Sequence, residues 1–314
     1  MRWQFGRHRF EWSEAPLTPL AAAEQPVLMG VVNVTPDSFS DGGRLAGVEA
    51  AVGHALRLVD EGAQIIDVGG ESSRPGAVPV DEAEERARVV PVVAALRARS
   101  AVCISVDTVK AAVADAALAA GADVVNDITA LGGDPDMAAV AAAHGAGVVL
   151  MHMRGRPATM QRGDLSSPDL VGEVVDHLHG RLDAARAAGI AADAICLDPG
   201  IGFGKTFEQN LSLVGELRRL RALGRPVLVG ASRKAFLGQL TGRAVEARDV
   251  ATAAASACAV WQGAHVLRVH AVGAVRDAVR VAAAMRWAAV AGDDDGALAA
   301  RSIPPRAVAP GAAR

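Results

Sequence analysis

Aromatic residues are scarce in this chain of 314 residues. They make up 3% of the sequence, and tyrosine is absent. Proteins that bind single-stranded nucleic acid stack bases on aromatic side chains, and nucleic-acid binders in general carry an excess of positive charge. Here the formal net charge is −3. The composition therefore argues against a nucleic-acid-binding protein.

Long apolar runs and closely spaced cysteines are also missing. No stretch near 18 residues is free of polar residues, so we expect no membrane span. Charged residues interrupt every apolar run before Pro26, so we expect no signal peptide. Cys103, Cys196 and Cys258 lie far apart inside apolar runs. This spacing indicates buried thiols in a reducing compartment, and we expect a cytoplasmic protein.

A repeating pattern of strand-like and helix-like segments runs along most of the chain. Runs rich in β-branched residues alternate with Ala-rich stretches of helical character. The predicted strands are residues 27–33, 64–68, 102–106, 123–126, 147–152, 194–197, 226–230 and 265–269. The predicted helices are residues 48–61, 80–99, 109–120, 135–143, 169–188, 207–223, 245–262 and 273–291. Eight strand–helix units in roughly 250 residues predict an α/β fold, a single (β/α)8 TIM barrel, since a doubly wound sheet usually has fewer strands.

The two ends of the chain depart from this repeat. Alternation over residues 4–12 predicts a short β-hairpin, and we assign residues 1–24 to an N-terminal extension that contains it. Residues 25–291 form the predicted barrel. Residues 292–314 are rich in Asp, Ala, Pro and Arg, which predicts a disordered tail.

The segment LDPGIGFGKT, residues 197–206, resembles a phosphate-binding loop only superficially. A Walker-type loop would need glycine at the position of Pro199, which has no N–H to donate to a phosphate. The three glycines are spaced G-x-G-x-G, which does not match the Rossmann pattern either. We therefore interpret Asp198, at the end of a predicted strand, as the functional residue of this segment.

Polar or Gly-rich sequence follows every predicted strand. In a TIM barrel, functional residues gather at the face where the strands end. The residues at these ends are Asn33, residues 69–71, Asp107, Asn126, His152, Asp198, Ser232, Arg268 and His270. A single Asp or Asn in this position often caps the next helix, but eight units that converge on one face make capping alone an insufficient explanation. We interpret His152 as structural and expect the other residues to line a binding site.

The first of these segments, NVTPDSFSDGG at residues 33–43, is too long for a tight connection. Loops of this kind in barrels are often mobile lids. Asn33 offers an amide oxygen, a suitable ligand for a hard cation, and Asp37 could orient a leaving group or a metal-bound water. The alternative is a solvated turn.

The second segment, GGESSRPG at residues 69–76, is rich in hydrogen-bond donors. Ser72, Ser73 and Arg74 carry the hydroxyl and guanidinium groups that hold phosphate oxygens. Arg268 and His270 alternate on the last strand and therefore point the same way. Because many barrels bind phosphate at the loops after strands seven and eight, these residues predict a site for a phosphorylated ligand.

The polar strand ends suit one kind of heterocycle. Asp107, Asn126 and Asp198 are acceptors, and Lys234, in GASRKAF, is a donor. A carboxylate that faces two adjacent N–H groups, with a lysine that faces a carbonyl, matches the edge of a 2-amino-4-oxo heterocycle, and such pairing rejects analogues that lack those groups. For Lys234 the alternative is an ion pair with an acid.

Taken in order, these motifs resemble the dihydropteroate synthase family over residues 27–291. The motifs are MGVVNVTPDSFSDGG, DVGGESSRPGA, SVDT, VVNDI, LDPGIGFGK, GASRKAFLG and LRVH, with FGRHRFEW as the N-terminal hairpin. The resemblance implies that the chain joins 4-aminobenzoate to 6-hydroxymethyl-7,8-dihydropterin diphosphate and releases pyrophosphate in folate synthesis. It also implies a homodimer, which we expect to form through late helices such as residues 245–262.

The resemblance further implies a role for each matching residue. The pterin would be held by Asp107, Asn126, Asp198 and Lys234. The diphosphate and Mg²⁺ would be held by Asn33, His270 and Arg268, and Arg268 would also stack on the ring. The aminobenzoate carboxylate would meet Ser232 at the start of a helix. The aminobenzoate ring would be enclosed by Phe39, Ser73 and Pro75, and Ser73 stands where the family often has Thr.

The chemistry implied by this family needs no strong nucleophile. The dihydropterin ring can release electrons to its CH₂ group, so the C–O bond can break first. Stabilising the departing pyrophosphate is then the main task, which suits Mg²⁺, Arg268 and a closing loop that carries Asp37. One alternative is a related pterin-binding barrel that transfers a methyl group, although the chemistry of such a barrel does not call for the SSRPG and RVH motifs. Another is a non-catalytic pterin-binding homologue, which should have a broken first loop.

Overall fold

The computed structural model describes residues 1–12, 25–34 and 43–292, and within them eight parallel strands form one sheet. The strand order is β8-β7-β6-β5-β4-β3-β10-β9. The strands are β3 (Val27–Asn33), β4 (Ile65–Gly69), β5 (Cys103–Asp107), β6 (Val124–Asp127), β7 (Gly147–Met151), β8 (Ile195–Asp198), β9 (Leu228–Val229) and β10 (Val266–Val269). Leu197 of β8 forms a parallel bridge with Val227, the residue before β9, so the two edges of the sheet meet. The predicted TIM barrel is confirmed.

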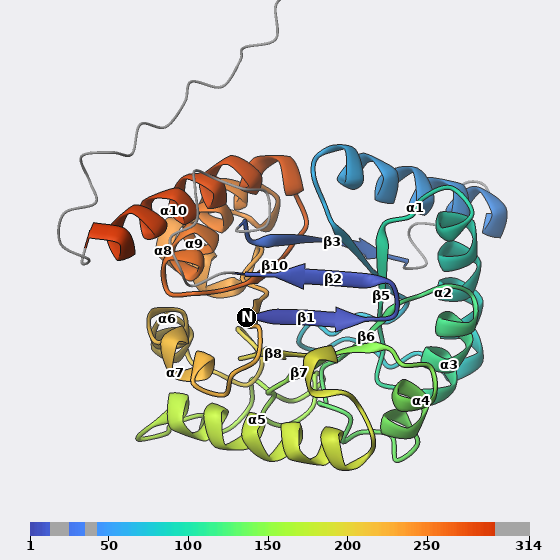
Figure 1. Cartoon of the computed structure of the whole chain (residues 1–314), viewed down its shortest axis with the longest axis horizontal. Coiled ribbons are helices and arrows are strands. Elements are labelled where there is room, and N and C mark those ends of the chain that lie inside the picture. The colour runs from blue at the N-terminus through green and yellow to red at the C-terminus, as the bar shows by residue number, and fades with distance from the viewer. Residues whose placement is uncertain (13–24, 35–42, 293–314) are drawn as a thin grey trace, which may run out of the picture.

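Helices surround this sheet (Figure 1). They are α1 (Gly43–Asp60), α2 (Glu82–Arg97), α3 (Ala111–Ala119), α4 (Met137–Ala143), α5 (Leu170–Ala187), α6 (Phe207–Gly215), α7 (Leu217–Arg221), α8 (Ala235–Thr241), α9 (Asp249–Trp261) and α10 (Val272–Gly292). Two short 3₁₀ helices are η3 (Ala192–Ala194) and η4 (Val245–Ala247). None of the helices within the described ranges combines the length and apolar character needed to cross a bilayer.

Side-chain caps fix where several helices begin. Asp81 accepts a hydrogen bond from Glu84 N at 2.8 Å before α2, and Asp169 accepts from Gly172 N at 2.9 Å before α5. Thr206 begins α6 with a capping box. Each cap satisfies a backbone N–H that the helix itself leaves unpaired. These caps define where each connection ends and its helix begins.

Three helical segments differ from the prediction. The helix predicted at residues 207–223 is divided into α6 and α7, because Glu216 has a non-helical backbone (φ −114°, ψ 21°). The helix predicted at residues 245–262 is divided into η4 and α9. The seven-residue helix α8 was absent from the helices predicted by pattern, and only the family resemblance implied a helix there, with its start at Ser232. Gly242 ends α8 in the left-handed conformation (φ 65°) that marks many helix ends.

The predicted N-terminal hairpin is confirmed, and it covers one end of the barrel. It consists of β1 (Arg2–Phe5) and β2 (His8–Glu11), which cross that end in Figure 1. Trp3 Nε1 donates to Ala194 O, just before β8, at 2.8 Å. Phe5 lies against Gly147 at the start of β7, where a Cβ would come within 2.6 Å of the ring. The hairpin therefore covers the N-terminal ends of the strands and leaves the opposite end for a binding site.

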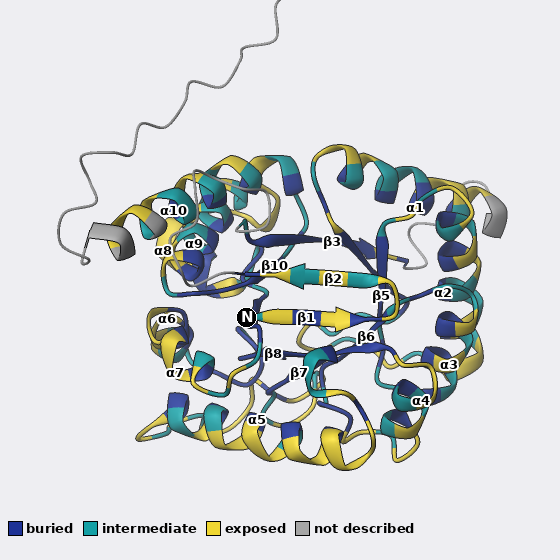
Figure 2. Cartoon of the chain, in the orientation of Figure 1, coloured by how far each residue is buried: buried dark blue, intermediate teal, exposed yellow. Residues whose placement is uncertain are grey.

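The barrel strands are almost entirely buried, whereas the hairpin strands β1 and β2 are partly exposed, and the helices alternate between buried and exposed faces (Figure 2). Cys103 and Cys196 are buried, as predicted, but Cys258 is exposed, so the prediction for that residue was wrong. The buried positions of α9 include Thr252, Ser256 and Ala259, and Cys258 falls on the other side of the helix. The tail predicted to begin at residue 292 lies, but for its first residue, outside the described residues, and the domain boundaries at 24 and 291 stay predictions.

Candidate active site

A row of polar residues crosses four neighbouring strands at their C-terminal ends. Asn33 of β3 pairs in register with Gly69 of β4, Gly69 pairs with Asp107 of β5, and Asp107 pairs with Asn126 of β6. Parallel register places residues of one row side by side on the same edge of the sheet. The barrel thus brings Asn33, Asp107 and Asn126 together, as the sequence predicted.

The side chain of Arg268, from β10, reaches across the barrel to this row. Its Nε donates to Asp67 Oδ2 at 2.6 Å, and its Nη2 donates to Asp107 Oδ2 at 2.7 Å. Asn126 Nδ2 also donates to Asp67 Oδ2, at 3.1 Å. Because a carboxylate only accepts hydrogen bonds, this contact leaves the amide oxygen of Asn126 available to a donor on a ligand.

Asp67 was not predicted as part of the site. It lies in the middle of β4, is fully buried, and has one oxygen, Oδ1, without a hydrogen-bond partner among the described residues. A carboxylate inside a buried strand is costly unless it is paired. Its presence in the apolar run IIDVG was therefore a usable signal, because a charge there requires a cation such as Arg268 nearby.

Burial and neighbouring charges shift the ionisation of this cluster. Burial raises the pKa of Asp107 to about 7, Arg268 opposes the shift, and Asp67 adds to it. Burial alone would lower the pKa of Arg268, but Asp67 and Asp107 outweigh it and leave the pKa raised. The cluster thus combines a permanent cation with a carboxyl group that exchanges its proton near neutral pH.

Asp198 and Lys234 form a second group at the same end of the barrel. Asp198 Oδ1 accepts from Gly200 N at 2.7 Å, which leaves Oδ2 for a ligand. Burial raises the pKa of Asp198 to about 6, and the Gly200 amide and Lys234 oppose it. Burial, with Arg268 next, lowers the pKa of Lys234 to about 8. The ammonium of Lys234 lies 4.1 Å from the ring centroid of Phe203, in a cation–π contact.

Ser232 and His270 contact each other at the mouth. Ser232 Oγ lies 2.9 Å from His270 Nδ1 and accepts from His270 N at 3.2 Å. Since the Ser232 hydroxyl accepts from the backbone amide of His270, we assign its own O–H as the donor to Nδ1. The ring proton of His270 then lies on Nε2. Burial, with Arg268 next, lowers the pKa of His270 to about 3, so the imidazole is neutral. Helix α8 begins at Ala235, three residues after Ser232, rather than at Ser232 itself.

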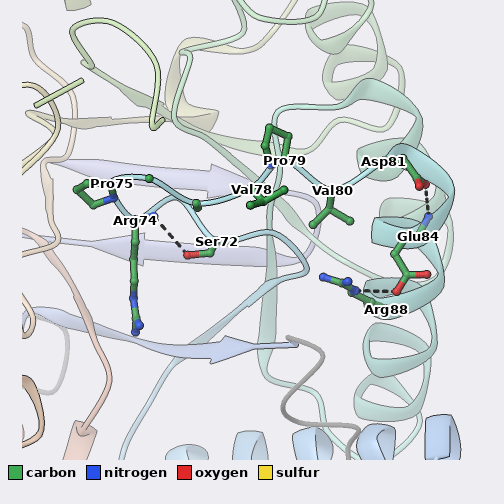
Figure 3. Close-up of a pocket in the computed structure, with 11 residues that line it drawn as sticks. Ser72, Arg74, Pro75, Val78, Pro79, Val80, Asp81, Glu84 and Arg88 are labelled. Atoms are coloured by element: carbon green, nitrogen blue, oxygen red, sulfur yellow. Dashed lines mark hydrogen bonds and ion pairs between the residues drawn. The ribbon is translucent and has the colours of Figure 1, made fainter. Parts of the chain in front are cut away.

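The segment after β4 lines a surface pocket (Figure 3). The pocket lies between this segment and the start of α2, and its lining includes Ser72, Arg74 and Pro75 but not Ser73. Arg74 N donates to Ser72 Oγ at 3.4 Å. Gly76 N donates to Pro157 O at 3.3 Å, which joins the segment to the loop after β7. The predicted residues Asp37 and Phe39 lie outside the described residues.

The metal ligand that the family resemblance implies at this end of the barrel is Asn33. Asn33 is exposed and offers a single amide oxygen. One group of three possible ligands exists within the described ranges, at His8, Cys103 and Asp123. Asp123 there accepts from Arg97 Nη2 at 2.5 Å, and such a guanidinium disfavours a bound cation. This second cluster also lies at the hairpin end, away from the polar row.

Comparison with known proteins agrees with this geometry. Residues 29–270 match the family described as "Pterin binding enzyme". The dihydropteroate synthase of Synechocystis sp. is 43% identical over 282 residues, which cover 89% of this chain and 93% of that protein. The chain belongs to the dihydropteroate synthase family. It is therefore related to transferases of folate biosynthesis.

Two solved structures of dihydropteroate synthases have the same fold. The Yersinia pestis enzyme, in complex with a sulfonamide drug, superposes with a TM-score of 0.82 at 40% identity, covering 91% of this chain and 99% of that one. The Xanthomonas albilineans enzyme, with 4-aminobenzoic acid, gives a TM-score of 0.77 at 47% identity, covering 85% of this chain and 93% of that one. The family and fold implied by the sequence motifs are thereby confirmed, and the roles of individual residues stay predictions.

Proposed function

We propose that this chain catalyses the reaction of the dihydropteroate synthase family. It joins 4-aminobenzoate to (7,8-dihydropterin-6-yl)methyl diphosphate, giving 7,8-dihydropteroate and diphosphate for folate biosynthesis. The observation that carries the proposal is the set of acceptors at the ends of β5, β6 and β8, Asp107, Asn126 and Asp198, with the donor Lys234 beside them. A ring edge with adjacent N–H groups and a carbonyl complements this set.

Asp198 has the properties needed to recognise the pterin ring. With a pKa of about 6 it is ionised at neutral pH, and its Oδ2 remains available. A buried carboxylate that pairs with two N–H donors discriminates strongly against rings that lack them, because the charge would then be left unpaired. Lys234 is close enough to Asp198 to influence its pKa, and its ammonium can donate to the ring carbonyl.

Arg268 can link pterin binding to diphosphate binding. In the free protein its Nη2 is held by Asp107. A ring N–H that donates to Asp107 would compete for that carboxylate and free Nη2 to turn toward the diphosphate. Asp67 would still hold Nε and keep the guanidinium in the mouth. His270, with its proton on Nε2, offers a second donor to the diphosphate.

Mg²⁺ is part of this proposal as an ion that enters with the diphosphate. Mg²⁺ that is bound to phosphates keeps several waters and takes only one or two protein oxygens. The single amide oxygen of Asn33 fits that requirement, whereas it could not by itself retain the metal. The bound ion would supply neutralisation of the negative charge that develops on the leaving group.

Bond breaking at the pterin CH₂ is the step that the site promotes. The C–O bond breaks, its electron pair leaves with the diphosphate, and the electron-rich ring stabilises the cation that remains. Arg268 and His270 stabilise the leaving group through hydrogen bonds. The amine of 4-aminobenzoate then attacks the CH₂ carbon and loses a proton to solvent. We assign the aminobenzoate to Ser232, Ser73 and Pro75, with Phe39 from the segment outside the described residues, and Asp37 of that segment to the leaving group.

The reaction itself is the direct test. The protein is incubated with the pterin diphosphate, Mg²⁺ and labelled 4-aminobenzoate, and labelled 7,8-dihydropteroate is measured by chromatography. We expect product with the parent chain, little with Asp198→Asn, and little when a chelator removes Mg²⁺. Absence of product from a folded parent chain that binds both substrates would contradict the proposal.

We also propose a homodimer that forms through the late helices. Exposed apolar side chains on α8–α10 include Leu240, Val250, Trp261, Val281 and Met285. Exposed apolar groups on neighbouring helices are typical of protein interfaces, and α9 lies within the segment that the family resemblance suggested. A cytoplasmic location remains part of the proposal, supported by three cysteines that form no disulfide.

A further inference from the structure

Lys205 is the residue of the glycine-rich segment that the proposed function leaves unexplained. Its side chain is almost completely buried, with 3% exposed. The ammonium Nζ donates to Phe203 O at 3.0 Å and to His152 O at 3.2 Å, and it lies 3.0 Å from His152 Nδ1. All three ammonium protons thus have an acceptor, and none of the acceptors carries a negative charge.

The glycines place this loop directly on the backbone that follows β7. Gly200 has φ 69°, and a Cβ there would lie 1.9 Å from His152 O. Gly204 has φ 65°, and a Cβ there would lie 2.6 Å from Arg154 O. Only glycine permits both the left-handed backbone and the close approach. The loop and the Lys205 ammonium therefore share one anchor, the carbonyl of His152.

This loop carries two groups of the proposed pterin site. It begins at Asp198, whose Oδ1 is fixed by the amide of Gly200 at 2.7 Å. It also carries Phe203, whose ring lies under the ammonium of Lys234 and whose carbonyl accepts from Lys205. A change in the position of Lys205 would therefore alter the placement of both Asp198 and Lys234.

Lys205 and Asp198 also interact through charge. Asp198, Arg154 and Lys234 carry the charges that act on the ionisation of Lys205. Lys205 also acts on His177, whose ring packs edge-on against His152 at 5.0 Å between centroids. Burial lowers the pKa of Lys205 to about 7, and Asp198 opposes that shift. Lys234, Lys205 and Arg268 act on Asp198 through charge, and all three oppose the burial that raises its pKa. The two titrations are therefore coupled near neutral pH.

We propose that Lys205 is a positioning residue for the pterin site, which holds the Asp198–Lys205 loop against the end of β7 and keeps the Asp198 carboxylate ionised. The segment that resembles a phosphate loop thus surrounds a cation of the protein itself instead of an anionic ligand. The inference rests on the proposed function, because it assigns Lys205 a role in pterin recognition. Lys205 itself makes no contact with the ligand.

The pH dependence of pterin affinity tests this role. Calorimetry with 6-hydroxymethyl-7,8-dihydropterin should show affinity that rises as Asp198 loses its proton near pH 6 and falls as Lys205 loses its proton above about pH 7. In Lys205→Met the fall should begin only as Lys234 loses its proton near pH 8, and the rise should move to higher pH. At pH 7 the affinity should drop by about twofold if the pKa of Asp198 rises from about 6 to about 7, and the drop should approach about tenfold for each further unit.

Two further variants separate charge from structure. Lys205→Gln keeps amide donors but not the charge, so it should reproduce the pH profile of Lys205→Met. Arg99→Met is the control, because Arg99 pairs with Glu49 on the outside of the barrel and should leave the profile unchanged. A wild-type profile in Lys205→Gln would overturn the electrostatic role, and a wild-type profile in both Lys205 variants would overturn the whole inference. If Lys205→Met does not fold, the parent protein alone provides the test. A pterin affinity that does not fall above about pH 7 in the parent would contradict the inference.

A measurement without pterin distinguishes this inference from the proposed function. The free energy of unfolding of the parent minus that of Asp198→Asn should fall between about pH 4 and about pH 6, since the folded protein holds the Asp198 proton more tightly than the unfolded chain. In the Lys205→Met background this fall should extend to higher pH. If it does and the parent still binds no pterin, the proposed function fails while the coupling of Lys205 to Asp198 holds. If the fall does not move, the inference fails whatever the protein binds.

Discussion

The guanidinium of Arg268 donates to the carboxylate of Asp107 across the mouth of the barrel, Nη2 to Oδ2, at 2.7 Å. Asp107 is nevertheless a carboxyl group whose pKa lies near 7, because burial outweighs the attraction of the guanidinium and Asp67 adds a second negative charge. The folded protein thus holds an acid that would be more easily ionised in the unfolded chain. Asp107 therefore lowers the free energy of unfolding near neutral pH, which is a common cost of residues that bind a ligand.

This relationship predicts how Asp107→Asn changes stability with pH. Between about pH 4 and about pH 7 the unfolded chain has lost the Asp107 proton while the folded protein retains it, so the stability of the parent falls as pH rises. The amide does not titrate. We therefore expect the stability of Asp107→Asn, relative to the parent, to increase across this window, as measured by urea denaturation at several pH values.

The control for this measurement is Asp169→Asn. Asp169 pairs with Arg219, which together with the Gly172 amide lowers its pKa to about 2. Its carboxyl group is ionised in the folded and unfolded states above about pH 5, so the difference from the parent should stay constant there. A constant difference for Asp107→Asn as well would show that Asp107 is not held protonated by the fold.

Replacement of Asp198 by Asn should weaken pterin binding severely and leave the fold intact. The amide would direct a donor at a donor on the ligand, and the loss of a buried charge pair costs about 2–5 kcal/mol. Calorimetric titration of the pterin measures the effect. Asp193→Asn is the matched control, because Asp193 pairs with Arg225 near the hairpin end of the barrel. An affinity for Asp198→Asn within about threefold of the parent would exclude the assigned role.

Much of the fold follows from the sequence because each strand is a short β-branched run that ends in polar residues. The strand predicted at residues 27–33 has the bounds of β3. Helix α8 was missing from the helices predicted by pattern, and the family resemblance alone implied a helix there, with its start at Ser232. Cys258 was misplaced because an apolar neighbourhood in the sequence does not reveal which side of a helix packs inward.

Some of the site residues could be predicted from the sequence and others could not. Asp107, Asn126 and Arg268 could be predicted because each stands at a strand end, where barrels place their functional groups. Asp67 and Lys205 could not be assigned in this way. Their importance arises from contacts between distant segments, Asp67 with Arg268 and Lys205 with His152, and such contacts exist only once the barrel has closed.

The turn that carries Ser232 and Lys234 should depend on a side-chain pair behind it. Arg233 stands between them with φ 57°, a conformation that is strained for any residue but glycine, and its Nε donates to Asp249 Oδ1 of α9 at 2.8 Å. We expect Asp249→Ala to reduce turnover about tenfold or more by releasing this turn, while stability falls by only ~1 kcal/mol because the pair is partly exposed.

Steady-state kinetics and thermal denaturation measure both effects. Glu49→Ala provides the comparison, since Glu49 accepts two hydrogen bonds from Arg99 on the outside of the barrel at 2.8 and 2.6 Å. It removes a similar pair without contact to the turn, so its turnover should equal that of the parent. Normal turnover in Asp249→Ala would mean that the turn keeps its shape without the pair.

The proposed dimer predicts a change in mass for one substitution on α9. Val250 is 84% exposed and would lose apolar contact with water if a second copy covered α9. Light scattering at micromolar concentration should give a dimer for the parent and a monomer for Val250→Glu. Leu211→Glu, on α6, should remain a dimer. A monomeric parent would exclude the dimer, and a dimeric Val250→Glu would place the interface elsewhere.

The contact between Ser232 and His270 predicts that Ser232→Ala weakens the binding of aminobenzoate and of pyrophosphate but leaves pterin binding unchanged. In Ser232→Ala the Nδ1 of His270 loses its donor and the backbone amide of His270 loses its acceptor. The imidazole is then free to take the other tautomer, with its proton on Nδ1 instead of Nε2. Ser232 is also the proposed partner of the aminobenzoate carboxylate. We therefore expect a higher KM for aminobenzoate and weaker binding of pyrophosphate.

Pterin affinity should not change in this variant, because the ring edge is assigned to Asp107, Asn126 and Asp198. Binding of 6-hydroxymethyl-7,8-dihydropterin, of pyrophosphate with Mg²⁺, and of aminobenzoate in the presence of both is measured by separate calorimetric titrations. Ser232→Thr, which keeps the hydroxyl, should restore most of the lost affinity. If Ser232→Ala weakened pterin binding as much as it weakened pyrophosphate binding, the substitution would have disturbed the whole mouth, and the separate roles assigned to Ser232 and His270 would be wrong.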